Sequence, residues 1–318
     1  MINKELIINS FSVIVPLYNK VEYIERAINS ILNQTYQNFE LIIVNDGSID
    51  GGEKKIELNK DSRIQLITQS NQGVSVARNT GAKNAKYNYL AFLDADDIWD
   101  ENFLEEINFL INEYPNAGIF ATNNYFEYPN GKVLYQNYDW IFGGKKSGII
   151  SDYFKIFAKI GKSPFSNSNI CIPQNIFESI GGYKAGVKST EDSDLWCRIA
   201  LKNNIAYLTT PLATYFIDLP NNTQLLIQRE DYQVSVTLQN SLDDNQVKPE
   251  HIKSVRKLIA FQQLSLVKRA ILTGNKAIAL DKLFDMRIFR KYRVCFFSHL
   301  LFALLPFNVF NKFKKLFK

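Results

Sequence analysis

The chain has 318 residues, of which 46% are hydrophobic, 22% charged and 13% aromatic, a composition that excludes a disordered or fibrous protein. The formal net charge is +5, but residues 287–318 contain eight basic residues and no acidic one. Without these eight charges the net charge of residues 1–286 is −3, which argues against nucleic-acid binding by that part of the chain.

Cysteine and histidine are sparse. The three cysteines, Cys171, Cys197 and Cys295, are widely spaced without a CxxC pair, which predicts reduced thiols in a cytoplasmic protein. The two histidines, His251 and His299, are too isolated for a histidine-based metal site. The N-terminal residues lack the apolar stretch of a signal peptide, so we expect no secretion.

Short apolar runs alternate with helical patterns from residue 12 to residue 123. We expect strands at 12–16, 39–44, 64–67, 89–93 and 117–121, and helices at 21–32, 52–58, 74–85 and 102–113. This alternation is typical of an α/β fold with a mostly parallel sheet covered by helices on both faces. Ligands bind beyond the carboxyl ends of such strands, so the polar residues there are candidates for a site.

The pattern changes along the rest of the chain. Residues 124–220 mix short extended pieces with two helices, one of them at 192–202. From residue 224 the chain is mainly helical, with apolar positions at Ile252, Val255, Leu258 and Ile259. We therefore expect a domain of residues 1–220, with halves at about 11–123 and 124–220, and a helical C-terminal region of residues 221–318.

The first two strands end in residues suited to a planar base. Pro16 cannot donate to a sheet ladder and ends the pairing, while Tyr18 can stack and Asn19 can hydrogen-bond. Asp46, at the end of the second strand, can accept a hydrogen bond from an imide N–H such as that of uracil. Plain turns remain the alternative at both places, and for Asp46 the turn is favoured when the stretch is considered alone.

Arg78 lies near the start of the third helix, at the same edge of the predicted sheet. A guanidinium suits a diphosphate because its donors form a planar fork. By itself, however, this position favours a solvated surface arginine.

Three acids follow the fourth strand. On an extended backbone the side chains of Asp94 and Asp96 share a face, and such close charges require a cation or hydrogen-bond donors. Mg²⁺ or Mn²⁺, shared with substrate phosphates, fits this pair. A calcium loop is excluded because Trp99 stands where the loop requires glycine and a strand precedes the motif. Asp97 is interpreted as a cap of the next helix.

Another acidic cluster opens the helix near residue 192. Ser189 or Thr190 can cap this helix, and the helix dipole favours acids in the first turn. Capping explains the density of Glu191, Asp192 and Asp194 less well. A carboxylate held here could act as a general base.

These motifs, in this order, resemble those of the family 2 glycosyltransferases, which have the GT-A (Rossmann-like) fold. The resemblance covers roughly residues 11–220, through SVIVPLYNK, LIIVNDGS, NQGVSVARN, LAFLDADDIW, IGGY and STEDSDLWCRIAL. It implies inverting transfer of a sugar from a nucleotide-sugar, a UDP-sugar in this interpretation, with Mg²⁺ or Mn²⁺ bound at the DxD motif.

The resemblance also implies a role for each matching residue. It implies that Pro16, Tyr18 and Asn19 border the nucleoside and that Asp46 contacts the base. It further implies that Arg78 lies near the diphosphate, that Asp94 binds the ribose and that Asp96 binds the metal. Asp192 matches the catalytic base, with Glu191 beside it to position the acceptor. In one departure, Tyr215-Phe216-Ile217-Asp218 replaces the Tyr-Arg-x-His of many relatives, although Asp218 could bind a hard cation through oxygen.

Other enzyme classes fit less well. A retaining hydrolase needs two carboxylates around a sugar and no nucleotide site. A sugar-nucleotide pyrophosphorylase needs a glycine-rich loop that is absent after the first strand. A protein that binds a sugar-nucleotide without catalysis remains an alternative. Residues 161–169 could line the acceptor cleft or form an ordinary loop.

The C-terminal tail, residues 287–318, has an apolar run flanked by basic clusters. This run, residues 294–310, is interrupted by His299, Pro306 and Asn308 and falls short of the ~20 clean residues of a spanning helix. We expect in-plane contact with an anionic membrane, with a terminal helix docked on the protein as the alternative. The family resemblance implies a peripheral protein at the inner face of a bacterial membrane, which builds capsule, exopolysaccharide or lipopolysaccharide on a glycan or lipid-linked acceptor.

Overall fold

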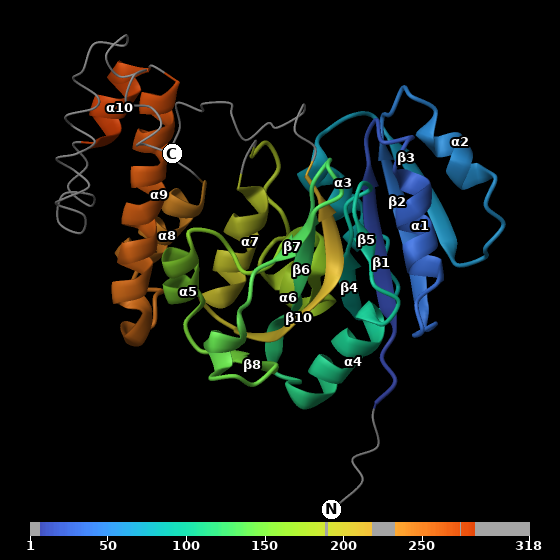
Figure 1. The fold of residues 1–318 in the computed structure, drawn as a ribbon, viewed down its shortest axis with the longest axis horizontal. Helices are drawn as coiled ribbons and strands as arrows, with labels where there is room; N and C mark the ends of the chain where they lie inside the picture. The colour runs from blue at the N-terminus through green and yellow to red at the C-terminus, as the bar shows by residue number, and fades with distance from the viewer. Residues whose placement is uncertain (1–6, 188–189, 218–232, 274, 284–318) are drawn as a thin grey trace, which may run out of the picture. The chain divides into compact units, whose positions relative to one another are not determined.

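The computed structural model describes residues 7–187, 190–217, 233–273 and 275–283 (Figure 1). It divides into two compact units, one of residues 1–153 and 163–220 and the other of residues 154–162 and 221–318. Helices within the described ranges are all too short or too polar to cross a membrane. Asp218, Cys295, His299 and the tail lie outside the described residues.

Within the described residues, ten strands of the first unit form one sheet. They are β1 (Phe11–Leu17), β2 (Phe39–Asp46), β3 (Ile64–Gln69), β4 (Tyr89–Phe92), β5 (Ile98–Trp99), β6 (Ala117–Glu127), β7 (Val133–Tyr135), β8 (Ser147–Ile150), β9 (Ile170–Pro173) and β10 (Asn204–Phe216). Their order is β3-β2-β1-β4-β9-β6-β10-β5, with β7 beside β6 and β8 beside β10.

The expected α/β sheet is confirmed, and its parallel part is the half that holds the first four strands. Val13 of β1 pairs with Leu41 of β2 on one side and Ala91 of β4 on the other, all in parallel. The sheet as a whole is mixed, because β9 runs antiparallel to both β4 and β6. Since β10 is parallel to β6, the strands β1, β2, β4 and β10 end at the same edge.

The helices of the first unit are α1 (Ile24–Leu32), α2 (Gly52–Glu57), α3 (Val74–Lys83), α4 (Phe103–Glu113), α6 (Gln174–Ser179) and α7 (Glu191–Ala200), with short 3₁₀ turns η1 (Asp139–Phe142) and η2 (Asn167–Asn169). Helix α7 begins one residue earlier and ends two residues earlier than expected. Strand β6 continues six residues beyond its expected end, because β10 and β7 pair with that extension.

Two apolar layers cover the parallel part of the sheet. Val13 and Val15 belong to one core cluster with residues of α1 and α4, and Ile42 and Val44 pack with Ala77 of α3 in another. Helix α3 comes very close to the sheet at Gly81, where an added Cβ would lie 2.5 Å from Ile14 Cγ2. Alternation of side chains along each strand thus fills both faces, as expected for a parallel sheet.

The described part of the second unit consists mainly of helices, as expected for the C-terminal region. Its elements include residues 154–160 of α5 (Tyr153–Ile160), α8 (Gln233–Asp243), η4 (Pro249–His251), α9 (Ile252–Leu272) and α10 (Lys276–Leu283). Of the apolar positions noted in α9, Val255, Leu258 and Ile259 are buried and Ile252 is half-buried.

Candidate active site

A cleft of about 370 Å³ lies where β1, β2 and β4 end. Six residues that the sequence analysis selected line it together: Pro16, Tyr18, Asp46, Arg78, Asp94 and Asp96. The described lining also includes Leu17, Lys20, Asn71, Gly73, Val74, Ala77 and Ala95. Motifs that are up to 80 residues apart in the sequence therefore converge, because parallel strands present their carboxyl ends at one edge.

Asn19 is not among the described residues that line the cleft. Its backbone is in the left-handed region, with φ of 51°, a conformation that asparagine tolerates. Its side-chain oxygen accepts from the Ile49 N–H at 2.9 Å, and its own N–H donates to Ser48 Oγ at 3.1 Å. Asn19 thus joins the turn after β1 to the loop after β2.

Asp46 is buried and holds the segment before α3. Its carboxylate accepts from Gln69 Nε2 at 2.7 Å, from the Gln72 N–H at 3.0 Å and from the Gly73 N–H at 2.8 Å. Gly73 has φ of 89°, a conformation that favours glycine. Asp46 therefore positions the start of α3 and also forms part of the cleft wall.

Arg78 is not a solvated surface residue, because only 3% of its side chain is exposed. Its guanidinium lies 2.6 Å from Asp94 Oδ1 and 3.5 Å from Glu191 Oε1, over the ring of Tyr183. Burial alone would lower the pKa of Arg78, but the neighbouring Asp94, Tyr183 and Glu191 raise it overall. Arg78 therefore remains charged and joins the end of β4 to the start of α7.

The Asp94–Asp97 segment is a turn, closed by a 3.0 Å hydrogen bond from the Asp97 N–H to the Asp94 carbonyl. The expectation of an extended backbone there was wrong, although the Asp94 and Asp96 side chains do line the same cleft. Asp94 pairs with Arg78, while Asp96 Oδ2 lies 2.6 Å from Lys20 Nζ. The two carboxylates are about one third exposed, 29% and 33%.

Asp97 does not cap a helix, so that interpretation was wrong. Helix α4 begins six residues later, after β5 and with Asn102 at the N-cap position. Asp97 is buried, and it accepts hydrogen bonds from the Ser168 hydroxyl and from the Phe216 N–H at 3.3 Å. Burial, then Asp94 and Asp96, raise the pKa of Asp97 well above its usual range.

Residues 167–169, part of the loop whose role the sequence left open, support the Asp94–Asp97 turn through hydrogen bonds. Ser168 Oγ accepts from the Asp94 N–H at 3.2 Å and donates to Asp97, and the Ser168 carbonyl accepts from the Trp99 indole at 2.6 Å. Asn169 donates to the Thr122 carbonyl at 2.6 Å. Residues 167–169 are buried, so this part of the loop is a support for the acidic turn.

Replacing Ser168 with Ala should lower the free energy of unfolding by about 1–3 kcal/mol, because the Asp94 N–H and the buried Asp97 carboxyl lose a partner. Urea unfolding followed by circular dichroism measures this change. The matched control is Ser179→Ala in the exposed end of α6, which should change stability by less than about 0.5 kcal/mol. Equal effects of the two variants would contradict a supporting role for Ser168.

Tyr215 is a second residue that the sequence analysis did not select. Burial raises the pKa of its phenol, followed by the charges of Asp97, Asp94, Asp96 and Asp192. The phenol is therefore within electrostatic range of carboxylates from both acidic motifs. Its only sequence signal was its position in the stretch that departs from the family pattern.

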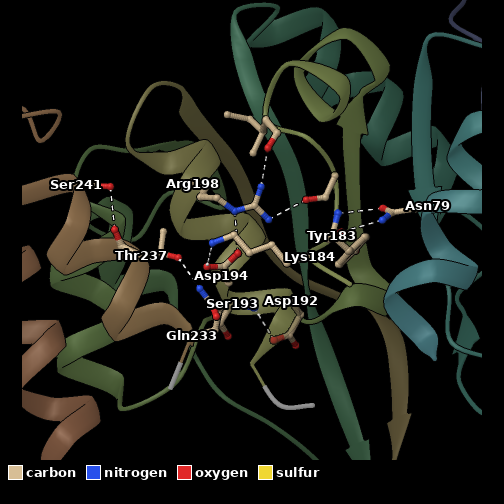
Figure 2. Close-up of polar contacts among 12 residues, drawn as sticks. Asn79, Tyr183, Lys184, Asp192, Ser193, Asp194, Arg198, Gln233, Thr237 and Ser241 are labelled. Atoms are coloured by element: carbon tan, nitrogen blue, oxygen red, sulfur yellow. Dashed lines mark hydrogen bonds and ion pairs between the residues drawn. The ribbon is translucent and has the colours of Figure 1, made fainter. Parts of the chain in front are cut away.

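The start of α7 differs from the capping expectation. Thr190 has φ of 65°, and among the described residues its hydroxyl has no hydrogen-bond partner; Ser189 is not described. The Asp192 carboxylate accepts from the Ser193 N–H (Figure 2). Burial, then the neighbouring Glu191, raise the pKa of Asp192 from 3.8 to about 6.

The third acid of this motif has a structural role. Asp194 is fully buried and pairs with Arg198 Nε at 2.7 Å and Lys184 Nζ at 3.2 Å. Arg198 also donates to the carbonyls of Ile180 at 2.8 Å and Gly182 at 2.7 Å. Figure 2 shows this guanidinium between α7 and the IGGY segment, residues 180–183. Arg198 therefore holds the IGGY segment against α7.

The same segment is also tied to α3. The Asn79 side chain accepts from the Tyr183 N–H at 2.9 Å and donates to the Tyr183 carbonyl at 2.7 Å (Figure 2). An added Cβ on Gly182 would lie 2.6 Å from Asn79 Oδ1, so glycine is needed for this close approach. The IGGY segment thus connects the helix of Arg78 with the helix of Asp192.

The donor set fits a divalent cation only if phosphate oxygens complete its shell. The described residues contain no cluster of three or more His, Cys, Asp or Glu that could hold a metal alone. Asp94 and Asp96 present oxygens to the cleft, and Mg²⁺ typically binds one or two carboxylates plus substrate phosphates. The residues therefore fit such an ion, although in this structure the Asp96 carboxylate pairs with Lys20.

Cys171 and Cys197 are buried free thiols. Burial raises the pKa of both well above the usual range for a thiol.

Comparison with known proteins places this chain in a family. The model of the family described as "Glycosyl transferase family 2" matches residues 12–171. An uncharacterized glycosyltransferase of Rickettsia bellii is 31% identical over 220 residues, which cover 67% of this chain and 29% of that protein. Glycosyltransferase GlyA of Streptococcus pneumoniae serotype 4 is 38% identical over 157 residues, 49% of this chain and 22% of that protein. The chain thus spans less than a third of the length of these two relatives.

Solved structures share the fold. The crystal structure of S. aureus TarS 1–349 in complex with UDP-GlcNAc has a TM-score of 0.63 and 18% identity, covering 86% of this chain and 89% of that one. The mannosyltransferase PcManGT from Pyrobaculum calidifontis, in complex with GDP-Man and Mn²⁺, has a TM-score of 0.59 and 18% identity, with 93% and 86% covered. These likenesses confirm the GT-A fold, and the matched family model shows that the chain belongs to glycosyltransferase family 2.

Proposed function

We propose that this chain is an inverting hexosyltransferase that moves a sugar from a UDP-sugar to a glycan or lipid-linked saccharide. The observation that carries the proposal is the buried Arg78, which contacts Asp94 of the cleft and Glu191 beside Asp192. One charged network therefore connects the candidate donor cleft with the candidate base. The choice of UDP is supported by the TarS complex with UDP-GlcNAc, a likeness of fold.

The proposed donor site is the cleft at the strand ends. Tyr18, 49% exposed beside Pro16, offers a ring face to the nucleoside. We propose that Asp46 accepts from the base, that Asp94 binds the ribose, that Arg78 supplies positive charge near the diphosphate, and that Asn19 holds the loop that borders the nucleoside.

The proposed reaction is a single displacement. The acceptor oxygen attacks the anomeric carbon, the bond from that carbon to the β-phosphate oxygen breaks, and the acceptor proton passes to Asp192. Attack from the face opposite the leaving UDP inverts the configuration. A carboxylate with a pKa of about 6 suits this role, because a general base works well when its pKa is near the operating pH. Glu191 would orient the acceptor.

Asp96 is the proposed protein ligand for Mg²⁺ or Mn²⁺. When bound, such an ion would neutralise charge that develops on the leaving diphosphate. Asp218 is proposed as an additional oxygen ligand; it lies outside the described residues.

A panel of nucleotide-sugars tests the proposal and its metal requirement together. With Mn²⁺, a UDP-sugar at 100 times its Kd should stabilise the fold by about 2.7 kcal/mol, and UDP should be released slowly by hydrolysis. EDTA or Asp96→Ala should remove most of the stabilisation and the release. Stabilisation by a GDP-sugar alone would contradict the UDP assignment. Formation of a UDP-sugar from UTP and a sugar phosphate would instead indicate a pyrophosphorylase.

We also propose that the basic tail, residues 287–318, holds the protein at an anionic membrane, where a lipid-linked acceptor of bacterial surface-polysaccharide synthesis would lie. The full chain should sediment with vesicles that contain anionic lipid, and a chain without residues 287–318 should not. A variant with the eight basic residues changed to Gln separates charge from apolar burial. An unchanged bound fraction after deletion would contradict the proposal.

A further inference from the structure

Lys20 occupies the carboxylate that the proposed function assigns to the metal. It follows Asn19 after β1, and its Nζ lies 2.6 Å from Asp96 Oδ2. Both side chains are about one third exposed, and both line the cleft with Asp94. Lys20 was not among the site residues predicted from the sequence.

Of the two ion pairs in the cleft, that of Asp96 is the one that can exchange. Arg78, the partner of Asp94, is buried and is also held by Glu191. Lys20 is more exposed, and lysine is a compact charge on a flexible stem. The Asp96 backbone is held separately, because Arg26 donates to its carbonyl and stacks 3.5 Å over the ring of Phe216. The Asp96 carboxylate can therefore change partner while its backbone stays in place.

A divalent cation and an ammonium group compete for Asp96. Both are positive, and Lys20 Nζ lies 2.6 Å from Asp96 Oδ2. A metal bound at this carboxylate would therefore repel the lysine nitrogen if the nitrogen stayed in that position. Because Lys20 lines the cleft, its released charge stays within the space proposed for the donor. The diphosphate of the donor would provide oxygens both for the metal and for Lys20.

We propose that Lys20 holds Asp96 in place of the metal in the nucleotide-free protein and moves to a diphosphate oxygen when the metal binds. This rests on the proposed function, since it requires a nucleoside diphosphate. Lys20 is then a diphosphate-binding residue that makes metal and nucleotide binding cooperative. By linkage, UDP should strengthen Mn²⁺ binding by the same factor by which Mn²⁺ strengthens UDP binding.

Electron paramagnetic resonance of free Mn²⁺ measures this coupling without an activity assay. In the wild-type chain, UDP should tighten Mn²⁺ binding by about 10–100-fold, within the usual range of such coupling. In Lys20→Met, Mn²⁺ alone should bind about tenfold more tightly, because its competitor is gone. In the presence of Mn²⁺, UDP should bind about tenfold more weakly to this variant, as its phosphate contact is lost.

Three further variants make the test specific. Lys55→Met on α2 removes an exposed lysine that pairs with Glu25 at 3.3 Å, and it should bind Mn²⁺ and UDP like the wild type. Lys20→Arg keeps the charge and should leave Mn²⁺ affinity close to that of the wild type. In an Asp96→Asn background, Lys20→Met should no longer tighten Mn²⁺ binding. Thermal unfolding verifies that each variant is folded.

Each result separates this inference from the proposed function. If Lys20→Met binds Mn²⁺ no more tightly than the wild type, the competition for Asp96 is overturned. If it retains wild-type UDP affinity with Mn²⁺ present, the phosphate contact is overturned. If the wild-type chain binds no UDP with Mn²⁺ and no UDP-sugar, the proposed function fails, and with it the role of Lys20 in diphosphate binding.

Discussion

Replacing Asp192 with Asn should lower sugar transfer by about 10²–10⁴-fold, the usual contribution of a general base, because the amide cannot take the acceptor proton. Binding of UDP with Mn²⁺ should remain within about twofold of the wild type, since the proposed donor ligands are on other elements. Steady-state transfer kinetics and UDP calorimetry on the same preparations measure both quantities. Loss of UDP binding with retained transfer would contradict the assignment.

The same residue should determine the pH dependence of sugar transfer. Because burial and Glu191 raise the pKa of Asp192 to about 6, kcat/KM should rise with pH through that value as the base ionises. Asp192→Asn should abolish this acidic limb. An activity that stays constant between pH 5 and 8 would contradict the role of Asp192.

The pKa shift also has a consequence for stability. A carboxyl whose pKa is raised by folding stabilises the fold below its unfolded value of 3.8, and this contribution is lost as pH rises through about 6. Asp192→Asn should therefore gain stability relative to the wild type at pH 8 and not at pH 4. Exposed Asp244, changed to Asn, is the control and should show no such dependence.

Replacing Arg78 with Met should lower the free energy of unfolding by about 3 kcal/mol, because breaking a buried ion pair leaves uncompensated charge. The variant leaves Asp94 and Glu191 without their shared cation. Transfer activity should fall with it, since both acidic motifs lose the group that connects them. Urea unfolding and the transfer assay measure the two effects.

Arg63→Met is the matched control for Arg78. Arg63 pairs with Asp61 at 2.6 Å, with about a quarter of each side chain exposed, so its loss should cost less than about 1 kcal/mol. Arg78→Lys should recover only part of the stability, because a lysine cannot contact two carboxylates through one planar fork. Equal stability of the Arg78 and Arg63 variants would contradict the structural role of Arg78.

Several features of the site could be predicted without coordinates. The alternation of apolar runs and helical patterns correctly placed Asp46 and Asp94 at ends of parallel strands, because such strands end at a common edge. The order of the motifs correctly indicated the family. These inferences use short-range periodicity and a topological rule, and both can be read along the chain.

Other features could not be predicted because they depend on distant residues. Asp97 was interpreted as a cap, since the sequence does not show that β5 intervenes or that Ser168, 71 positions later, contacts its carboxyl. Arg78 alone suggested a surface residue, because its partner Glu191 is 113 positions away. The pairing of Asp96 with Lys20 likewise joins residues 76 positions apart.

The sequence by itself determined the α/β class, the helical C-terminal region and the strand ends where acids gather. It could do so because side-chain periodicity follows from backbone geometry within one element. Only the tertiary structure decided which charged groups pair, namely that Asp94 pairs with a buried arginine and Asp96 with a partly exposed lysine. Burial and partner identity depend on contacts between distant segments, and these contacts determine how a carboxylate behaves.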